Sequence, residues 1–86
     1  MTVRYSKSAL KFLGKQDKYS VARIKAAISG LTLSVPAGNI KAMQGCDDGR
    51  LRLRVNGWRI IYKYGIEKDT EALYIMDIGN RGDIYK

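Results

Sequence analysis

The stretch from Arg50 to Lys63 reads Arg-Leu-Arg-Leu-Arg-Val-Asn-Gly-Trp-Arg-Ile-Ile-Tyr-Lys, and it predicts a β-hairpin. Asn56 and Gly57 lie between two runs that alternate apolar and basic residues, which is the strongest short-range hairpin signal. A type I′ turn at these two residues requires φ > 0 at both. The turn also sets the strand register, with Arg54 directly opposite Arg59.

The predicted hairpin has one apolar face and one basic face, because successive side chains of a strand point to opposite sides. Like charges directly opposite each other destabilise a hairpin by roughly 0.2–1 kcal/mol per pair. A sheet that concentrates such repulsion is suited to receiving an anion. The apolar face carries Leu51, Leu53, Val55, Trp58, Ile60 and Tyr62. The basic face carries Arg50, Arg52, Arg54, Arg59 and Lys63, with Ile61 as its apolar member.

The composition indicates one small basic domain spanning residues 1–86. A net charge of +8 and an isoelectric point near 9.8 point to a polyanionic partner. Nucleic acid and an acidic protein are the leading candidates, and a membrane surface is third. No apolar run approaches the roughly 18 residues of a transmembrane helix, and the first residues lack the apolar core of a signal peptide. We therefore expect a cytoplasmic protein with no membrane partner.

The residue types exclude several kinds of catalytic site. Cys46 is the single cysteine, which permits no disulfide within the chain and fits the cytoplasm. The chain contains no histidine, which excludes a Cys–His nucleophile and argues against a zinc site. We expect no metal and no cofactor.

Around the hairpin, apolar spacing and turn residues predict an α+β domain in the order β-α-α-β-β-β-β. Ser6 and Asp17 are the expected N-caps of two helices that pack together on one sheet face. Pro36 and the glycine after it break the chain before the next strand. The expected elements are a strand at 2–5, helices at 6–13 and after 17, a strand at 40–43, a turn at 45–49, the hairpin at 50–64, a polar loop at 65–71, a strand at 72–78, a break at 79–82 and a tail at 83–86.

Two interpretations of the basic face are open. It could be an ordinary solvated surface, since basic residues on exposed strands are common and protect sheet edges. However, solubilising surfaces usually mix charges of both signs, whereas these two strands carry no acid on that face. Its cations are four arginines and one lysine, and the planar arginine fork suits phosphate. The pattern therefore favours a phosphate-binding face.

Cleavage of RNA would need more than this face. Attack by a 2′-oxygen requires a base, charge stabilisation at the phosphoryl oxygens and an acid at the leaving 5′-oxygen. Without histidine, the available side chains are Tyr, Lys, Asp, Glu or a well-placed Arg. Arg81 follows the last predicted strand and Tyr85 comes four residues later, so both reach the basic face if the chain turns at Gly79 and Gly82. The alternative for Tyr85 is a packing role.

Three segments resemble the RelE/ParE superfamily of bacterial toxins, and specifically its RelE branch. They are Lys-Ala-Met-Gln-Gly at 41–45, the hairpin at 50–62, and Asp-Ile-Gly-Asn-Arg-Gly-Asp-Ile-Tyr at 77–85. The specific part is a pair of motifs: basic-x-basic-x-Arg-x-x-Gly-aromatic-Arg-hydrophobic-hydrophobic-Tyr, then Ile-Gly-x-Arg-x-x-hydrophobic-Tyr. The resemblance covers nearly the whole chain and implies the RelE-like fold, a small antiparallel-rich sheet with two N-terminal helices on one face.

The resemblance also implies a function. RelE-type toxins of type II toxin–antitoxin systems are ribosome-dependent endoribonucleases that cut mRNA in the ribosomal A site and halt translation. The 2′-oxygen attacks the adjacent phosphate and leaves a 2′,3′-cyclic phosphate and a 5′-hydroxyl. The implied partners are the ribosome, mRNA and a cognate RelB-like antitoxin that wraps the toxin with an acidic segment.

Carried over by position, the resemblance assigns roles to residues of this chain. Arg59 matches the arginine that stabilises the phosphoryl charge, and Arg81 the later arginine that supports the transition state or the leaving group. Tyr85 matches the tyrosine that orients the nucleotide or takes part in proton transfer. The predicted catalytic residues are Arg52, Arg59, Arg81 and Tyr85. The predicted RNA-binding residues are Arg50, Arg54, Lys63 and Lys41.

This chain departs from the RelE pattern at two positions. Arg50 and Arg52 stand where the best-known RelE toxins have lysine, and arginine is effectively always protonated, so a lysine base at position 52 cannot be transferred. Arg52 can stabilise an oxyanion, and Tyr85 can serve as base if clustered cations lower its phenol pKa. Two other hypotheses stay open: a ParE-like toxin that poisons DNA gyrase by binding, and a non-catalytic basic RNA-binding module. The combination of Arg59, Arg81 and Tyr85 favours the nuclease.

Overall fold

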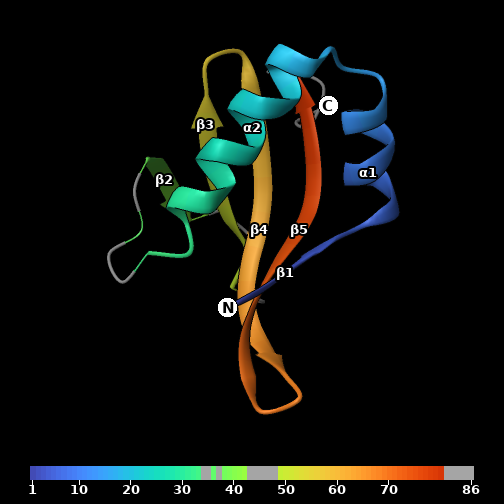
Figure 1. Ribbon diagram of the computed structural model, residues 1–86. Helices are drawn as coiled ribbons and strands as arrows, with labels where there is room; N and C mark the ends of the chain where they lie inside the picture. Colours follow the sequence, from blue (N-terminus) through green and yellow to red (C-terminus); the bar gives the residue numbers. More distant parts are fainter. Residues whose placement is uncertain (34–35, 37, 43–48, 81–86) are drawn as a thin grey trace.

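The computed structural model describes residues 1–33, 36, 38–42 and 49–80. Its elements follow the predicted order β-α-α-β-β-β-β, so the α+β prediction is confirmed. Figure 1 shows two short helices beside one curved sheet. The elements are β1 (Thr2–Tyr5), α1 (Lys7–Gly14), α2 (Lys18–Gly30), β2 (Asn39–Ala42), β3 (Leu51–Val55), β4 (Trp58–Glu67) and β5 (Thr70–Asn80).

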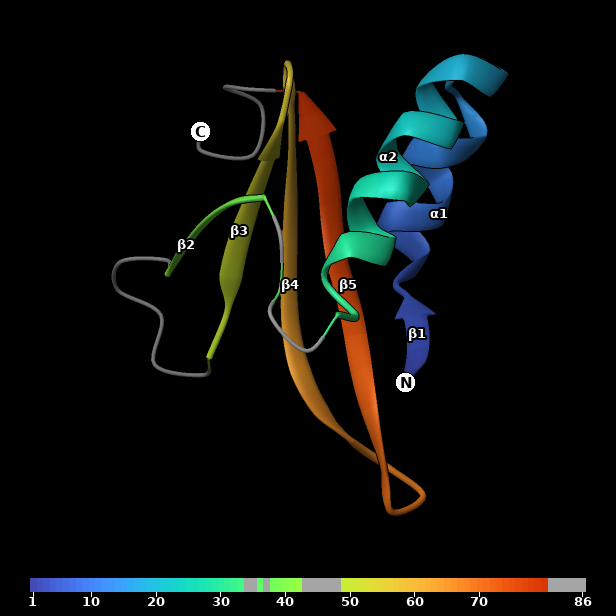
Figure 2. The same ribbon diagram turned by 60° about the vertical axis from the view of Figure 1, so that its left-hand side comes forward.

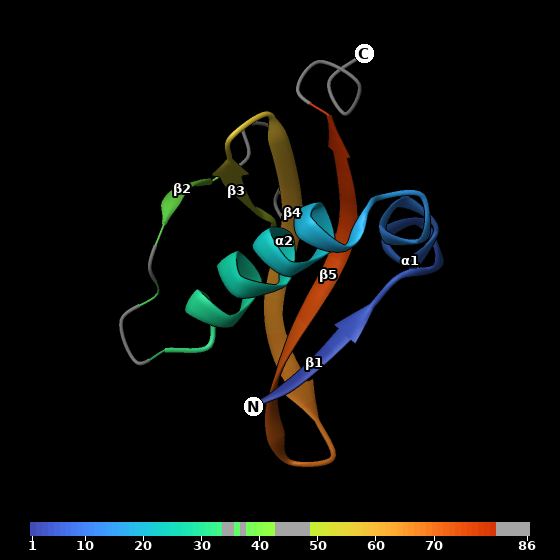
Figure 3. The same cartoon turned by 45° about the horizontal axis from the view of Figure 1, so that its top comes forward.

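The five strands form one sheet in the order β1-β5-β4-β3-β2. β1 pairs in parallel with β5, and the remaining pairs are antiparallel. Seen closer to edge-on, both helices lie on the same side of the sheet (Figure 2). Figure 3 shows α2 crossing in front of β4 and β5, with α1 beyond β5. No described helix covers the opposite side.

Both helices begin at the predicted N-caps. The Ser6 hydroxyl accepts a hydrogen bond from the backbone N–H of Ala9 at 3.0 Å, and the Asp17 carboxylate accepts one from that of Ser20 at 2.7 Å. Such bonds satisfy backbone donors that have no partner within the helix. The hydrogen bond from Ser20 holds the pKa of the Asp17 carboxyl below its usual range. Ser6 also donates to the Met76 carbonyl at 2.7 Å, which fastens the start of α1 to β5.

The core lies between the helices and the apolar face of the sheet. Tyr62, at the centre of β4, is fully buried and packs edge-on against Tyr64 with ring centroids 5.7 Å apart. Trp58, Val55 and Leu51 are partly buried beside this cluster. The predicted apolar face of the hairpin is therefore confirmed. The buried cluster comprises Ala9, Leu13, Ile24, Ile28, Leu31, Leu53, Ile60, Tyr62, Leu73, Ile75 and Ile78.

The β3–β4 hairpin has the predicted register, with Arg54 opposite Arg59 and Val55 opposite Trp58. Its turn differs from the expected type I′. Asn56 has a φ of 51°, but Gly57 lies outside the left-handed region. The register is kept because the loop still has two residues, and loop length determines which residues face each other.

The second hairpin corrects two predictions. Residues 65–71 are not a polar loop, because β4 and β5 pair as far as Glu67 and Thr70. Lys68 and Asp69 form the two-residue turn with φ values of 50° and 62°, the φ signs that a type I′ turn needs. The expected break at Gly79 is also wrong, since Gly79 pairs with Arg59 inside the ladder. Ladder pairing with a neighbouring strand outweighs the weak strand preference of glycine.

The strand expected at 40–43 is present as β2, which ends at Ala42. Met43, most of the predicted turn at 45–49, including Cys46, and the predicted tail at 83–86 lie outside the described residues. Within the described part of the chain, no helix is long and apolar enough to span a membrane.

Candidate nucleic-acid interface

The uncovered side of the sheet carries the predicted cations. On β3 and β4, Arg52, Arg54, Arg59 and Lys63 alternate with core residues such as Leu53, Ile60 and Tyr62. Lys41 on β2 pairs with Arg52 and so continues the same face onto the neighbouring strand. Arg50 directly precedes β3. We call this set the basic face, and its members are Lys41, Arg50, Arg52, Arg54, Arg59 and Lys63.

The register arranges these cations in rows across the strands. One row joins Arg54 and Arg59, and the next joins Lys41 and Arg52. Each row brings two positive side chains to directly opposed positions, an arrangement that destabilises a sheet unless an anion is nearby. The structure therefore brings together the six predicted sites that fall within its described part.

The basic face is not uniformly solvated. Arg59 is only 8% exposed, although it belongs to the side that no described helix covers. Ile61, the apolar member of this side, is 4% exposed. Arg50, Arg52, Arg54 and Lys63 are partly buried, and Lys41 is exposed. Neighbouring residues therefore cover most of the Arg59 side chain, so the basic face is not a freely hydrated surface at this position.

Arg52 has an unsatisfied donor at its guanidinium. Its Nε atom is buried, and no residue in the described part of the chain accepts a hydrogen bond from it. A buried charged group without a partner costs free energy, so such a group calls for an explanation. The Nε atoms of Arg54 and Arg59 are also buried without a hydrogen bond to any described residue, but Arg50, Arg54 and Arg59 each make a further polar or electrostatic contact.

The strand next to Arg59 contributes two features that sequence reasoning missed. Gly79 pairs with Arg59 and presents no side chain beside it. Asp77 pairs with Ile61 and so introduces an acid at the β5 edge of the same side. Its Oδ1 atom accepts hydrogen bonds from the Ser8 hydroxyl at 2.8 Å and the Ile78 N–H at 2.9 Å. The acid is therefore engaged with α1. Alternation along β5 could not have assigned its side, because the β4–β5 register shifts between Ile61 and Tyr62.

Tyr62 belongs to the hairpin but not to the basic face. Its side chain faces the core, and its buried hydroxyl has no hydrogen-bond partner among the residues that the structure describes. Burial, with a smaller effect of Tyr64, raises the pKa of the Tyr62 phenol to about 12. Both the direction of this side chain and its retained proton exclude Tyr62 as a base on the opposite side of the sheet.

Two predicted catalytic residues, Arg81 and Tyr85, lie outside the described residues. Their roles stay predictions. The last described residue, Asn80, ends β5 next to the β3–β4 turn, where it pairs with Trp58.

Comparison with known proteins identifies the family. The sequence model of the ParE toxins of type II toxin–antitoxin systems matches residues 3–85. The chain belongs to this family. No curated protein is significantly similar to it in sequence. The predicted membership of the RelE/ParE superfamily is thus confirmed.

Solved structures show the same fold. A chain of the RelB–RelE antitoxin–toxin complex from Methanococcus jannaschii has a TM-score of 0.71 at 23% identity, covering 96% of this chain and 95% of that one. The YoeB/ParE toxin from Agrobacterium tumefaciens has a TM-score of 0.74 at 17% identity, covering 94% and 99%. The isolated Escherichia coli RelE toxin has a TM-score of 0.68 at 18% identity, covering 98% and 89%. At these identities the likeness establishes the fold.

Proposed function

We propose that this toxin-family protein is a ribosome-dependent endoribonuclease that cleaves mRNA in the A site and is neutralised by a RelB-like antitoxin. The observation that carries the proposal is the basic face, where Arg59 lies buried between Arg54 and the side-chain-free Gly79. A buried, oriented guanidinium is suited to charge that develops on a phosphoryl group, because it needs little reorganisation during the reaction.

The proposed reaction is a transesterification. The 2′-oxygen attacks the adjacent phosphorus, the bond from phosphorus to the 5′-oxygen breaks, and a 2′,3′-cyclic phosphate forms. Arg59 stabilises the equatorial oxygens, and the unpaired Nε of Arg52 offers a donor to the same phosphate or to the attacking oxygen. The 2′-hydroxyl proton goes to a base, and the 5′-oxygen takes up a proton as it leaves. Arginine cannot act as that base, so we assign it to Tyr85 or to a group of the ribosome.

Arg50, Arg54, Lys63 and Lys41 would hold flanking phosphates of the mRNA. Along β3, Arg50 to Arg54 spans about 13 Å, comparable to about two nucleotides of extended RNA. The antitoxin partner is supported by matched structures that are antitoxin–toxin complexes, including a RelBE2 complex from Mycobacterium tuberculosis. An acidic segment would complement a chain with a net charge of +8.

The alternative is inhibition of DNA gyrase, and the match to the ParE toxin family favours it. Fold alone does not separate the two activities, because one scaffold can carry unrelated functions. The basic face serves both hypotheses, since a positive surface can bind either RNA or an acidic surface of a protein. The discriminating measurement must therefore read the product rather than binding.

The test is cleavage of mRNA on programmed ribosomes, mapped by primer extension and by the chemistry of the new ends. We expect cyclic phosphate ends from the wild-type protein and at least a tenfold slower reaction with Arg59→Ala. Arg23→Ala is the matched control, because it removes the same charge from α2 on the other side of the molecule. Intact mRNA together with inhibited gyrase supercoiling would instead establish the ParE-like activity, and wild-type cleavage by Arg59→Ala would overturn the role given to Arg59.

A further inference from the structure

An apolar hollow lies on the same side of the sheet as the basic face, toward β1. Its volume is about 320 Å³, and Arg4, Lys63, Tyr74 and Met76 are among its lining residues. The ladder aligns Lys63, Tyr74 and Arg4 in one row across β4, β5 and β1. The hollow therefore adjoins the basic face through Lys63, which belongs to both.

The ring of Tyr74 forms one wall of this hollow, and Gly65 lets it lie close to β4. A Cβ atom at residue 65 would lie 2.7 Å from Cε2 of Tyr74, closer than side-chain packing permits. The ring thus occupies the space that a side chain at residue 65 would fill. Tyr74 remains partly exposed, so the ring is available to a ligand as well as supported by the strand.

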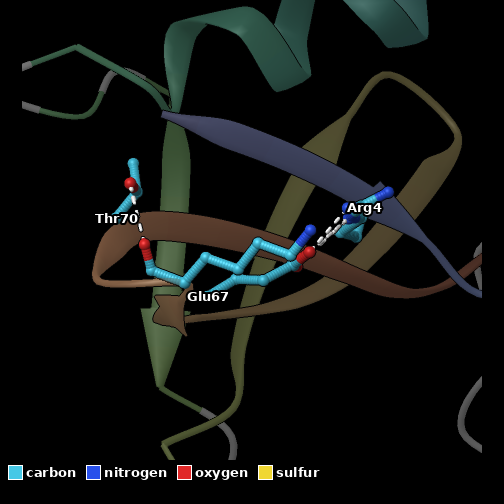
Figure 4. A network of polar contacts seen from close by, with 4 residues as sticks. Arg4, Glu67 and Thr70 are labelled. Carbon is cyan, nitrogen blue, oxygen red and sulfur yellow. Dashed lines mark hydrogen bonds and ion pairs between the residues drawn. The ribbon is translucent and has the colours of Figure 1, made fainter.

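The charges around the hollow differ between its two ends. At the β1 end, the Nε of Arg4 donates to both carboxylate oxygens of Glu67 at 3.1 Å, an ion pair drawn in Figure 4. This bond and the charge of Arg4 lower the pKa of the Glu67 carboxyl, which stays ionised. At the other end, the side chain of Lys63 makes no hydrogen bond or ion pair with any described residue. The unneutralised charge therefore lies on the side facing the basic face.

We propose that this hollow receives an unstacked base of single-stranded RNA, which packs on Tyr74 while Lys63 holds its phosphate. The inference deepens the proposed function and rests on it. Unstacked RNA bases commonly pack on aromatic side chains beside cations, and base stacking is tolerant of sequence. An apolar hollow with a charge at its mouth fits a flat base attached to a phosphate better than it fits an acidic peptide, whose charges would meet the Glu67 end.

The position of the hollow sets the spacing of this base from the reacting phosphate. Arg59 and Lys63 are four residues apart on β4, a distance of about 13 Å, which is comparable to about two nucleotides of extended RNA. The base in the hollow would then belong to a nucleotide about two positions from the phosphate at Arg59.

The test uses binding rather than cleavage. The probe is a fluorescent 2′-O-methyl oligoribonucleotide, which cannot undergo attack by the 2′-oxygen, with one abasic position moved along its length. We expect one abasic position to weaken wild-type binding by roughly fivefold to a hundredfold, the usual range for one stacked base. The probe without an abasic position should bind Tyr74→Ala more weakly than the wild type by a similar factor. Introducing the abasic position should then cause no further loss of affinity in this variant. Tyr74→Phe should behave as the wild type.

Tyr19→Ala is the matched control, because Tyr19 is 68% exposed on α2 and far from this side of the sheet. Gly65→Ala is a second variant that keeps the aromatic residue but displaces its ring, and it should weaken the probe in the same position-specific way. If Tyr74→Ala fails to fold, Gly65→Ala and Tyr74→Leu carry the test, with thermal unfolding as the check.

The proposal would be overturned if Tyr74→Ala bound the probe with wild-type affinity, or if no abasic position had a distinct effect. It would also be overturned if Tyr74→Ala lost binding to an acidic antitoxin peptide but kept its full affinity for RNA. The result is separable from the proposed nuclease activity. If one abasic position weakens binding as expected but mRNA is not cleaved on ribosomes, only the proposed nuclease activity is contradicted. If mRNA is cleaved normally but no abasic position has a distinct effect, only the proposed base-binding hollow is contradicted.

Discussion

The two faces of the β3–β4 hairpin are built from the same strands, yet α2 and α1 pack against one face while no described helix covers the other. On the covered face, Leu53 and Ile60 are almost completely buried in the core. On the other face, neighbouring positions hold Arg52, Arg54 and Arg59. One face therefore supplies buried apolar contacts to the core, whereas the other sets positive charges opposite one another at a cost in stability.

The largest expected effect is on the covered face. Leu53→Ala should lower the free energy of unfolding by about 2–5 kcal/mol, because it removes buried methyl groups and leaves a cavity. Arg52→Ala, the adjacent residue on the opposite face, should change it by less than about 1 kcal/mol. Urea denaturation of both variants measures the contrast. Similar losses in the two variants would mean that the faces do not differ in their contribution to stability.

The second prediction concerns alkaline pH. The pKa of Tyr62 is about 12 in the folded chain, above the value near 10 of an exposed tyrosine, so the folded state keeps a proton that the unfolded state loses. The stability contribution is therefore fully present below pH 10 and is lost as the pH rises toward 12, by up to about 3 kcal/mol.

Tyr62→Phe should flatten this loss and leave stability at neutral pH equal or higher, because it removes a buried hydroxyl with no hydrogen-bond partner in the described ranges. Thermal unfolding between pH 8 and 12 measures it, with Tyr19→Phe as the control on an exposed helix position. Burial also raises the pKa of Tyr64 and Tyr5, so part of the pH dependence should persist. If the stability of Tyr62→Phe fell with pH as steeply as that of the wild type, the role given to the buried Tyr62 phenol would be wrong.

The third prediction concerns the uncovered face. If it contacts three to five phosphates, the logarithm of the RNA binding constant should fall against the logarithm of salt concentration with a slope of roughly −2 to −4. Between 50 and 200 mM salt the affinity should then fall by roughly tenfold to a few hundredfold. Arg52→Ala should make the slope shallower by about 0.7, whereas Arg23→Ala on α2 should leave it unchanged. Salt-independent binding would exclude a phosphate-binding face.

The smallest effect has the opposite sign to the first. Lys41 and Arg52 are directly opposite each other on β2 and β3, so Lys41→Gln should stabilise the fold by about 0.2–1 kcal/mol while weakening RNA binding. Lys25→Gln on α2 is the control for removing a lysine elsewhere. Chemical denaturation of replicate samples can resolve the difference, and a destabilised Lys41→Gln variant would show that these two charges do not repel.

The sequence predicted the parts of the fold in which one local signal dominates. Asn56-Gly57 was sufficient for the register of the first hairpin, and Ser6 and Asp17 for the helix starts, because short-range geometry controls these features. The sequence did not predict the second hairpin, because its turn residues Lys68 and Asp69 include no glycine. Only the pairing of β4 with β5 shows that a turn is needed there. The strand break expected at Gly79 was wrong for the same reason, because pairing with β4 determines where β5 ends and the glycine does not.

The candidate site shows the same limit. Alternation along the strands identified the six described cations of the basic face, since a strand's two sides follow from its sequence. Burial of Arg59, the unpaired Nε of Arg52 and the engagement of Asp77 with Ser8 depend on what neighbouring strands and helices bring close. The hollow beside Tyr74 needs three strands in register, and no pattern within one of them indicates it.

The pairing of β1 with β5 has a consequence for the order of events during synthesis. Ser6 and Met76, which share a hydrogen bond, are separated by 70 positions, and among the described strands β1 lies beside β5 alone. The first strand and both helices therefore emerge from the ribosome before the surface on which they rest exists. Contacts of such long sequence separation form late and slow folding. Every shortened chain that lacks β5 therefore also lacks the surface on which β1 and both helices rest, and it cannot assemble the core.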